Sequence, residues 1–161
     1  MIVKITKILF LTTLAICFVA CSERPSQPAN TKPAETVSSI DPCSLLTKEE
    51  VGTVLGQEVS EAKVRSSPRP NCQYSIGEGS VTVFVFTDPS APGGFQAGKT
   101  MQDAHTEAVS DVDHEAYWSP DIKTLNVLKG NIYFTVQFYG VSSGSKETMK
   151  TLAQKAAARL P

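Results

Sequence analysis

The chain contains 161 residues, with 15 Lys and Arg against 16 Asp and Glu, and only two histidines. A formal net charge of −1 argues against nucleic-acid binding, which usually leaves a strongly basic footprint. The length has room for one domain with a hydrophobic core of ordinary size.

Residues 1–20 are organised like a cleavable export signal. Lys4 and Lys7 form a short positive region, and an apolar stretch follows over residues 8–20. A helix that crosses a bilayer needs about 20 apolar residues, so this stretch is too short to be a good membrane span. The segment is therefore predicted to be a signal peptide.

The signal ends in Phe18-Val19-Ala20-Cys21. This ending resembles the lipobox of bacterial lipoproteins, with Phe18 in the position that is usually Leu. The resemblance implies that Cys21 becomes the mature N-terminus and carries palmitate and other lipid. We therefore expect a protein that is lipid-anchored to a bacterial cell membrane and faces the periplasm or the cell exterior.

Cleavage before Cys21 would leave 141 residues and remove two lysines and no acidic residue, so the net charge would become −3. Residues 21–40 are predicted to be the lipidated cysteine and a disordered tether, because they contain three prolines and many small polar residues without an apolar period. Residues 41–161 are predicted to form a single domain.

The remaining cysteines divide by position. Cys17 lies in the predicted signal and is lost with it, which leaves Cys43 and Cys72 in the folded part. An even pair in an exported protein indicates a disulfide, which would stabilise the fold by about 3–4 kcal/mol. A metal or redox pair is the alternative, although the spacing lacks a CxxC motif and a nearby histidine.

The first half of the domain is predicted to contain one helix and three strands. Thr47 and Glu50 fit a capping box at the start of a helix over residues 48–55, and Gly56 follows as a stop. Composition then favours strands. Their predicted ranges are 58–64, 72–76 and 81–87.

The second half is predicted to contain two helices and three strands. Helical spacing of alanines favours a helix over residues 95–109, and Ser145 is a candidate cap for a final helix with an apolar stripe. The predicted strands cover residues 115–118, 125–128 and 132–139. The whole indicates an α+β fold, an antiparallel sheet covered by amphipathic helices in the order helix, three strands, helix, three strands, helix.

Four short motifs resemble those of a domain of unknown function found in small bacterial lipoproteins and exported proteins, many of them actinobacterial. That resemblance covers residues 41–160. It implies a Cys43–Cys72 bridge and a sandwich similar to PsbP-like folds, and it carries no established activity. The motifs are Asp41-Pro42-Cys43-Ser44-Leu45-Leu46-Thr47, Asn71-Cys72-Gln73-Tyr74, Glu115-Ala116-Tyr117-Trp118 and Lys129-Gly130-Asn131.

The densest group of possible metal ligands is Asp111, Asp113, His114 and Glu115. Oxygen ligands with one imidazole could bind a divalent cation, which leaves a metal-binding protein or a metal-assisted hydrolase centred on His114 as an alternative function. The spacing matches neither an EF-hand nor a zinc protease, so a solvated acidic loop is the simpler interpretation. No nucleophile elbow is present, and no catalytic residue or cofactor is expected.

Aromatic residues supply the other candidate site. Tyr117 and Trp118 are adjacent in a predicted strand, so they should point to opposite faces, and one of them could join Tyr133 and Tyr139 in a binding surface. Burial of all four under helices is the alternative. We therefore expect a non-enzymatic binding or accessory module of the cell envelope, whose partner is an envelope protein or a small apolar ligand.

Overall fold

The computed structural model describes residues 40–66, 69–102 and 105–161. The predicted signal, the lipid site at Cys21 and almost all of the predicted tether lie outside the described residues. Within these ranges, no helix is both long and apolar enough to cross a membrane.

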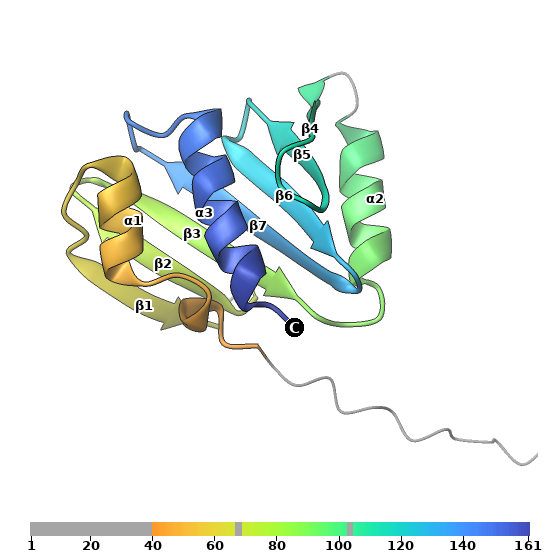
Figure 1. Cartoon of the computed structure of the whole chain (residues 1–161), viewed down its shortest axis with the longest axis horizontal. Helices are drawn as coiled ribbons and strands as arrows, with labels where there is room; N and C mark the ends of the chain where they lie inside the picture. The colour runs from red at the N-terminus through yellow and green to blue at the C-terminus, as the bar shows by residue number, and fades with distance from the viewer. Residues whose placement is uncertain (1–39, 67–68, 103–104) are drawn as a thin grey trace, which may run out of the picture. The chain divides into compact units, whose positions relative to one another are not determined.

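The domain has a short 3₁₀ turn, three α-helices and seven strands (Figure 1). The helical elements are η1 (Pro42–Ser44), α1 (Lys48–Leu55), α2 (Ala91–Met101) and α3 (Lys146–Arg159). The strands are β1 (Glu61–Arg65), β2 (Asn71–Ile76), β3 (Gly79–Phe86), β4 (Glu107–Val109), β5 (Glu115–Ser119), β6 (Thr124–Lys129) and β7 (Ile132–Tyr139).

All seven strands form one antiparallel sheet in the order β1-β2-β3-β7-β6-β5-β4. Strand β7 is central, with β3 on one side and β6 on the other. The α+β class and the antiparallel sheet are thus confirmed. The predicted order is not fully matched, because four strands rather than three lie between α2 and α3.

The extra strand is β4, which occupies the end of the segment 95–109 that was predicted to be one helix. The predicted bounds of that helix are therefore wrong. The helix begins earlier, because Pro92 in the first turn needs no amide donor, and it ends at Met101. Residues 107–109 instead pair with β5, which places Val109 beside Ala116 in the core. This pairing outweighs the helical spacing of the alanines, a weak local preference.

Helices α1 and α3 lie side by side on one face of the sheet (Figure 1). The apolar residues of β7 that face them, Phe134, Val136 and Phe138, are buried. The predicted apolar stripe of α3 is buried against the sheet as well. Its members are Met149, Leu152, Ala153, Ala156 and Leu160.

A disulfide joins Cys43 in η1 to Cys72 in β2, which confirms the predicted pairing. The loop that it closes spans 29 positions, so the bond restricts the unfolded chain considerably. Next to it, the buried Tyr74 hydroxyl donates a 2.7 Å hydrogen bond to the Leu46 carbonyl oxygen. Together these bonds hold the segment before α1 against the sheet.

Glu50 and Arg159 connect the start of α1 to the end of α3. The guanidinium donates two bonds to the carboxylate, at 2.7 and 2.9 Å, and a third to the Leu45 carbonyl at 2.7 Å. The same carboxylate completes the predicted capping box by accepting from the Thr47 amide at 2.9 Å. Hydrogen bonding from Arg159, followed by that from Thr47, lowers the pKa of Glu50 from 4.5 to about 2.

This lowered pKa makes domain stability depend on pH. Because the folded pKa lies below the unfolded value, ionised Glu50 contributes stability that is complete above pH 4.5 and is lost as the pH falls towards about 2. After allowance for partial exposure, we expect Glu50→Gln to lower the free energy of unfolding by about 1–2 kcal/mol at neutral pH. The deficit should shrink as acid is added.

Urea unfolding curves at several pH values would measure this deficit. Glu49→Gln is the matched control, because Glu49 lies in the same helical turn and its carboxylate makes no side-chain hydrogen bond within the described residues. A Glu50→Gln deficit that stays constant between pH 7 and pH 2 would contradict the assignment.

Candidate functional site

The second face of the sheet carries aromatic and uncharged polar side chains. Residues that alternate with the core positions of β3, β6 and β7 point to this face. The strand register aligns Tyr117, Asn126, Thr135 and Phe84 in one row across four neighbouring strands. This face therefore differs in chemistry from the face under α1 and α3, where the inward residues are almost all apolar.

Helix α2 covers only part of this second face. Its fully buried Phe95 packs against Tyr117 and Tyr133, with ring centroids 5.0 and 5.6 Å apart. Tyr133 also stacks on Phe86 at 4.7 Å. At Gly98, an added Cβ would lie 2.6 Å from the Tyr117 hydroxyl, so glycine is what permits this close approach.

The uncovered part of the face forms an open trough of three adjoining hollows. A central hollow of about 260 Å³ includes Phe84 and Asn126 on its floor. It shares Arg69, Phe86 and Tyr133 with a hollow of about 340 Å³ beside the start of α2. At its other end it shares Ile122 and Gln137 with a hollow of about 330 Å³. We refer to these three hollows together as the trough.

The central hollow of the trough is nearly uncharged. Arg69, which lies 5.0 Å above the Phe86 ring, is the one charged side chain among its described lining residues. Burial raises the pKa of both Tyr117 and Tyr133, so their hydroxyls stay neutral at physiological pH. The Tyr133 hydroxyl donates to Asn126 Oδ1 at 2.8 Å. Neutral hydrogen-bonding groups and aromatic rings therefore line the central hollow together.

The predicted aromatic surface is divided between the two faces. Tyr117 and Tyr133 line the central hollow. Tyr139, which is 76% exposed, lines the end hollow that shares Ile122 and Gln137 with it. Trp118 points the other way and is buried in the core with 7% exposure. Tyr117 and Trp118 thus face opposite sides, and Trp118 takes no part in the trough.

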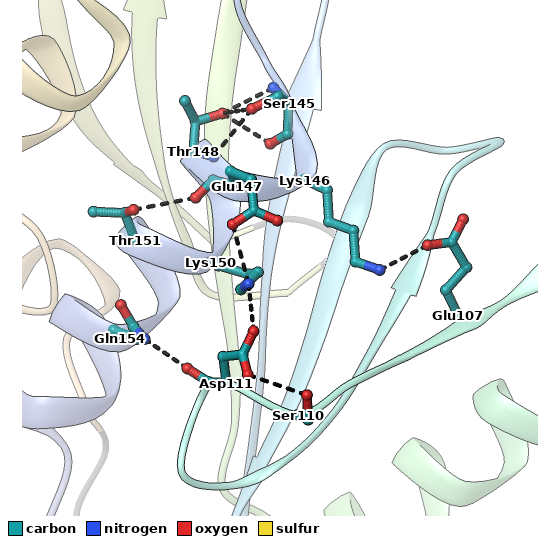
Figure 2. Close-up of polar contacts among 10 residues, drawn as sticks. All are labelled: Glu107, Ser110, Asp111, Ser145, Lys146, Glu147, Thr148, Lys150, Thr151 and Gln154. Atoms are coloured by element: carbon teal, nitrogen blue, oxygen red, sulfur yellow. Dashed lines mark hydrogen bonds and ion pairs between the residues drawn. The ribbon is translucent and has the colours of Figure 1, made fainter.

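The four candidate metal ligands do not form one group, because Asp111 and Glu115 bond to lysines on different helices. Asp111 accepts from Lys150 of α3 at 2.8 Å, and its backbone carbonyl accepts from Gln154 at 2.6 Å (Figure 2). Nearby, Lys146 pairs with Glu107 at 2.7 Å. Hydrogen bonding from Lys150 lowers the pKa of Asp111. Asp111 thus anchors α3 to the β4–β5 connection.

The other three candidates have different surroundings. Glu115 accepts from Lys99 of α2 at 3.0 Å, which lowers its pKa. Asp113 has a positive φ of 56°, and it lines a hollow of about 150 Å³ together with His114. Within the described ranges, no three His, Cys, Asp or Glu residues are grouped so that they could hold a metal ion.

Sequence reasoning missed most other residues that line the trough, among them Arg69, Phe84, Asn126 and Gln137. The signal for two of them was present, because Phe84 and Gln137 alternate with core residues in strands that were predicted. Asn126 was hidden in a short apolar run, and Arg69 in a proline-containing loop.

Comparison with protein families, with curated proteins and with solved structures finds no significant match for this chain.

Proposed function

We propose that this protein is a lipid-anchored, non-enzymatic binding module of the bacterial cell envelope, and that the trough is its ligand site. The observation that carries the proposal is the incomplete cover of the second sheet face, which leaves aromatic and polar side chains around three joined hollows. An envelope protein or a small ligand with apolar parts would be bound there.

The N-terminal sequence supports the anchoring. The run Phe18-Val19-Ala20-Cys21 follows a short positive region and an apolar stretch, and residues 22–40 read as a tether. A flexible coil of that length spans about 25 Å, enough to separate the domain from the membrane surface. The anchored domain could then meet ligands in the envelope space.

The chemistry of the trough supports binding rather than catalysis. General acid–base work uses groups that titrate near the operating pH. The described side chains of the central hollow are neutral apart from Arg69, and the raised pKa values of Tyr117 and Tyr133 suit hydrogen bonding to a ligand better than proton transfer. Ligand pockets commonly combine aromatic walls with a few polar groups in this way.

Anchoring is tested by Cys21→Ser. Because the lipid attaches to the cysteine sulfur, we expect the variant to incorporate no labelled palmitate, to remain an unprocessed precursor and to lose lipid-dependent membrane retention. Metabolic labelling and fractionation would measure this, with Cys17→Ser as the control that should behave like the wild type. A Cys21→Ser chain that is still cleaved after Ala20 would show an ordinary secreted protein instead.

Binding in the trough is tested by replacing Phe84 with a photo-crosslinking phenylalanine analogue in the full chain. On illumination of intact cells, we expect an adduct of defined mass on this position, because its ring lines the central hollow. The same analogue at Val64 is the control, since Val64 is 53% exposed on the edge strand β1 and lies outside the trough.

A second variant distinguishes an adduct with a specifically bound ligand from an adduct formed by chance collision. Gln137→Ala removes an amide that lines two of the hollows and should reduce the yield of the adduct at position 84. Equal yields at positions 84 and 64, or a yield that does not respond to Gln137→Ala, would contradict the proposed site.

A further inference from the structure

Building on the proposed function, we infer that the ligand of the trough is a neutral glycan chain. The inference rests on a weakly satisfied buried donor, and on an amide and an aromatic ring without partners among the described residues, which lie together in the central hollow. A sugar ring has an apolar face and several hydroxyl groups around its edge, and each of these matches one feature of the trough.

The weakly satisfied donor is the side-chain amide of Asn126, which is only 4% exposed. Its oxygen is well bonded to the Tyr133 hydroxyl, at 2.8 Å. Its Nδ2, however, reaches Ser119 Oγ and the Thr124 carbonyl only at 3.5 Å, beyond the usual range of a protein hydrogen bond. A ligand hydroxyl could accept a shorter bond from this buried donor.

Gln137 and Phe84 supply the other two features. Within the described residues, the Gln137 side chain makes no hydrogen bond, so both its donor and its acceptor are open to a ligand. Phe84 lines the same hollow and, among the described residues, stacks on no other ring, whereas Phe86 is covered by Tyr133 and Arg69. One ring face and the side-chain amides of Asn126 and Gln137 thus remain for recognition.

A wholly apolar ligand such as an acyl chain fits this floor poorly. Thr124, Asn126 and Thr135 form part of it, and each is less than one-tenth exposed. An acyl chain would remove the remaining water from these groups without replacing its hydrogen bonds, which is unfavourable. A polyhydroxylated ligand replaces them.

An extended peptide is also disfavoured, because of where the trough lies. Peptides that bind to sheets usually add a strand at an open edge, where backbone groups are unpaired. The floor here belongs to β3, β7 and β6, interior strands whose backbone groups are already paired on both sides. Only side chains are available, and most of these are amides and hydroxyls.

The dimensions favour a chain of units over a single small molecule. Each hollow, at about 260–340 Å³, is near the lower limit of an ordinary small-ligand pocket. They are continuous through shared residues, and the charged groups lie towards the two ends, with Asp88 in one end hollow and Asp121 and Lys123 in the other. The middle hollow, in which Arg69 is the one charged side chain among the described lining residues, suits a neutral oligosaccharide.

The test is calorimetric titration of the full chain, in a zwitterionic detergent that has no sugar headgroup. The probes are chitohexaose, maltohexaose and cellohexaose, with decanoate and an uncharged hexapeptide as competing classes. We expect at least one hexasaccharide to bind with a dissociation constant below about 1 mM. Phe84→Ala and Gln137→Ala should each weaken that binding at least about tenfold.

Lys63→Ala, on the exposed edge strand β1, is the control and should leave the affinity unchanged. Because Gln137 is only partly buried, we expect Gln137→Ala to fold normally, so it still tests the site if Phe84→Ala lowers the stability of the domain. Sugar binding that is insensitive to both trough variants would overturn the inference.

Other outcomes separate the inference from the proposed function. If decanoate or the peptide binds in a Gln137-dependent way while no hexasaccharide does, the glycan assignment is wrong and the trough is still a ligand site. If no probe binds and the position-84 adduct is also absent, both the glycan assignment and the proposed function fail.

Discussion

Neighbouring residues of the central strand β7 point to opposite faces of the sheet, and three helices must cover both faces. On one face, Phe134, Val136 and Phe138 lie under α1 and α3. On the other, Tyr133 packs against the buried Phe95 of α2, whereas Thr135 and Gln137 line the trough that α2 leaves uncovered. The unequal cover of the two faces determines where the core ends and where a ligand can enter.

The well-covered face is held by bonds that connect distant parts of the chain. The disulfide joins η1 to β2, Arg159 joins the end of α3 to the start of α1, and Lys150 joins α3 to the β4–β5 connection. These links give the sheet a rigid base. The open face can therefore present Phe84 and Asn126 at fixed positions, which favours binding by reducing the loss of conformational freedom.

Local signals predicted most of the fold. The capping box at Thr47, the alternation in β7 and the cap at Ser145 depend on residues close in sequence, and each was predicted with the correct element. The fourth strand of the second half was missed, because β4 depends on pairing with β5 rather than on its own residues. Similarly, the predicted helix began at residue 95, whereas α2 begins at Ala91 with Pro92 in its first turn.

The site was predictable only in part, for a related reason. Alternation shows that Tyr117 and Trp118 face opposite sides, but which side a helix covers depends on long-range packing. The row that brings Asn126 beside Thr135, and Thr135 beside Phe84, is set by strand order and register, and Thr135 and Phe84 are 51 positions apart in sequence. No single segment of the sequence contains that information.

The claim that helices cover the two faces of the sheet unequally is tested most directly at two adjacent positions of β7. Thr and Val have nearly the same shape, so each can replace the other in a separate variant. Val136→Thr places a hydroxyl in the core and should lower the free energy of unfolding by about 1–3 kcal/mol. Thr135 is also buried, but its hydroxyl makes no hydrogen bond within the described residues, so Thr135→Val leaves no partner unpaired and should be nearly neutral. Urea unfolding of the two variants gives both values, and equal losses, or a larger loss for Thr135→Val, would contradict this account.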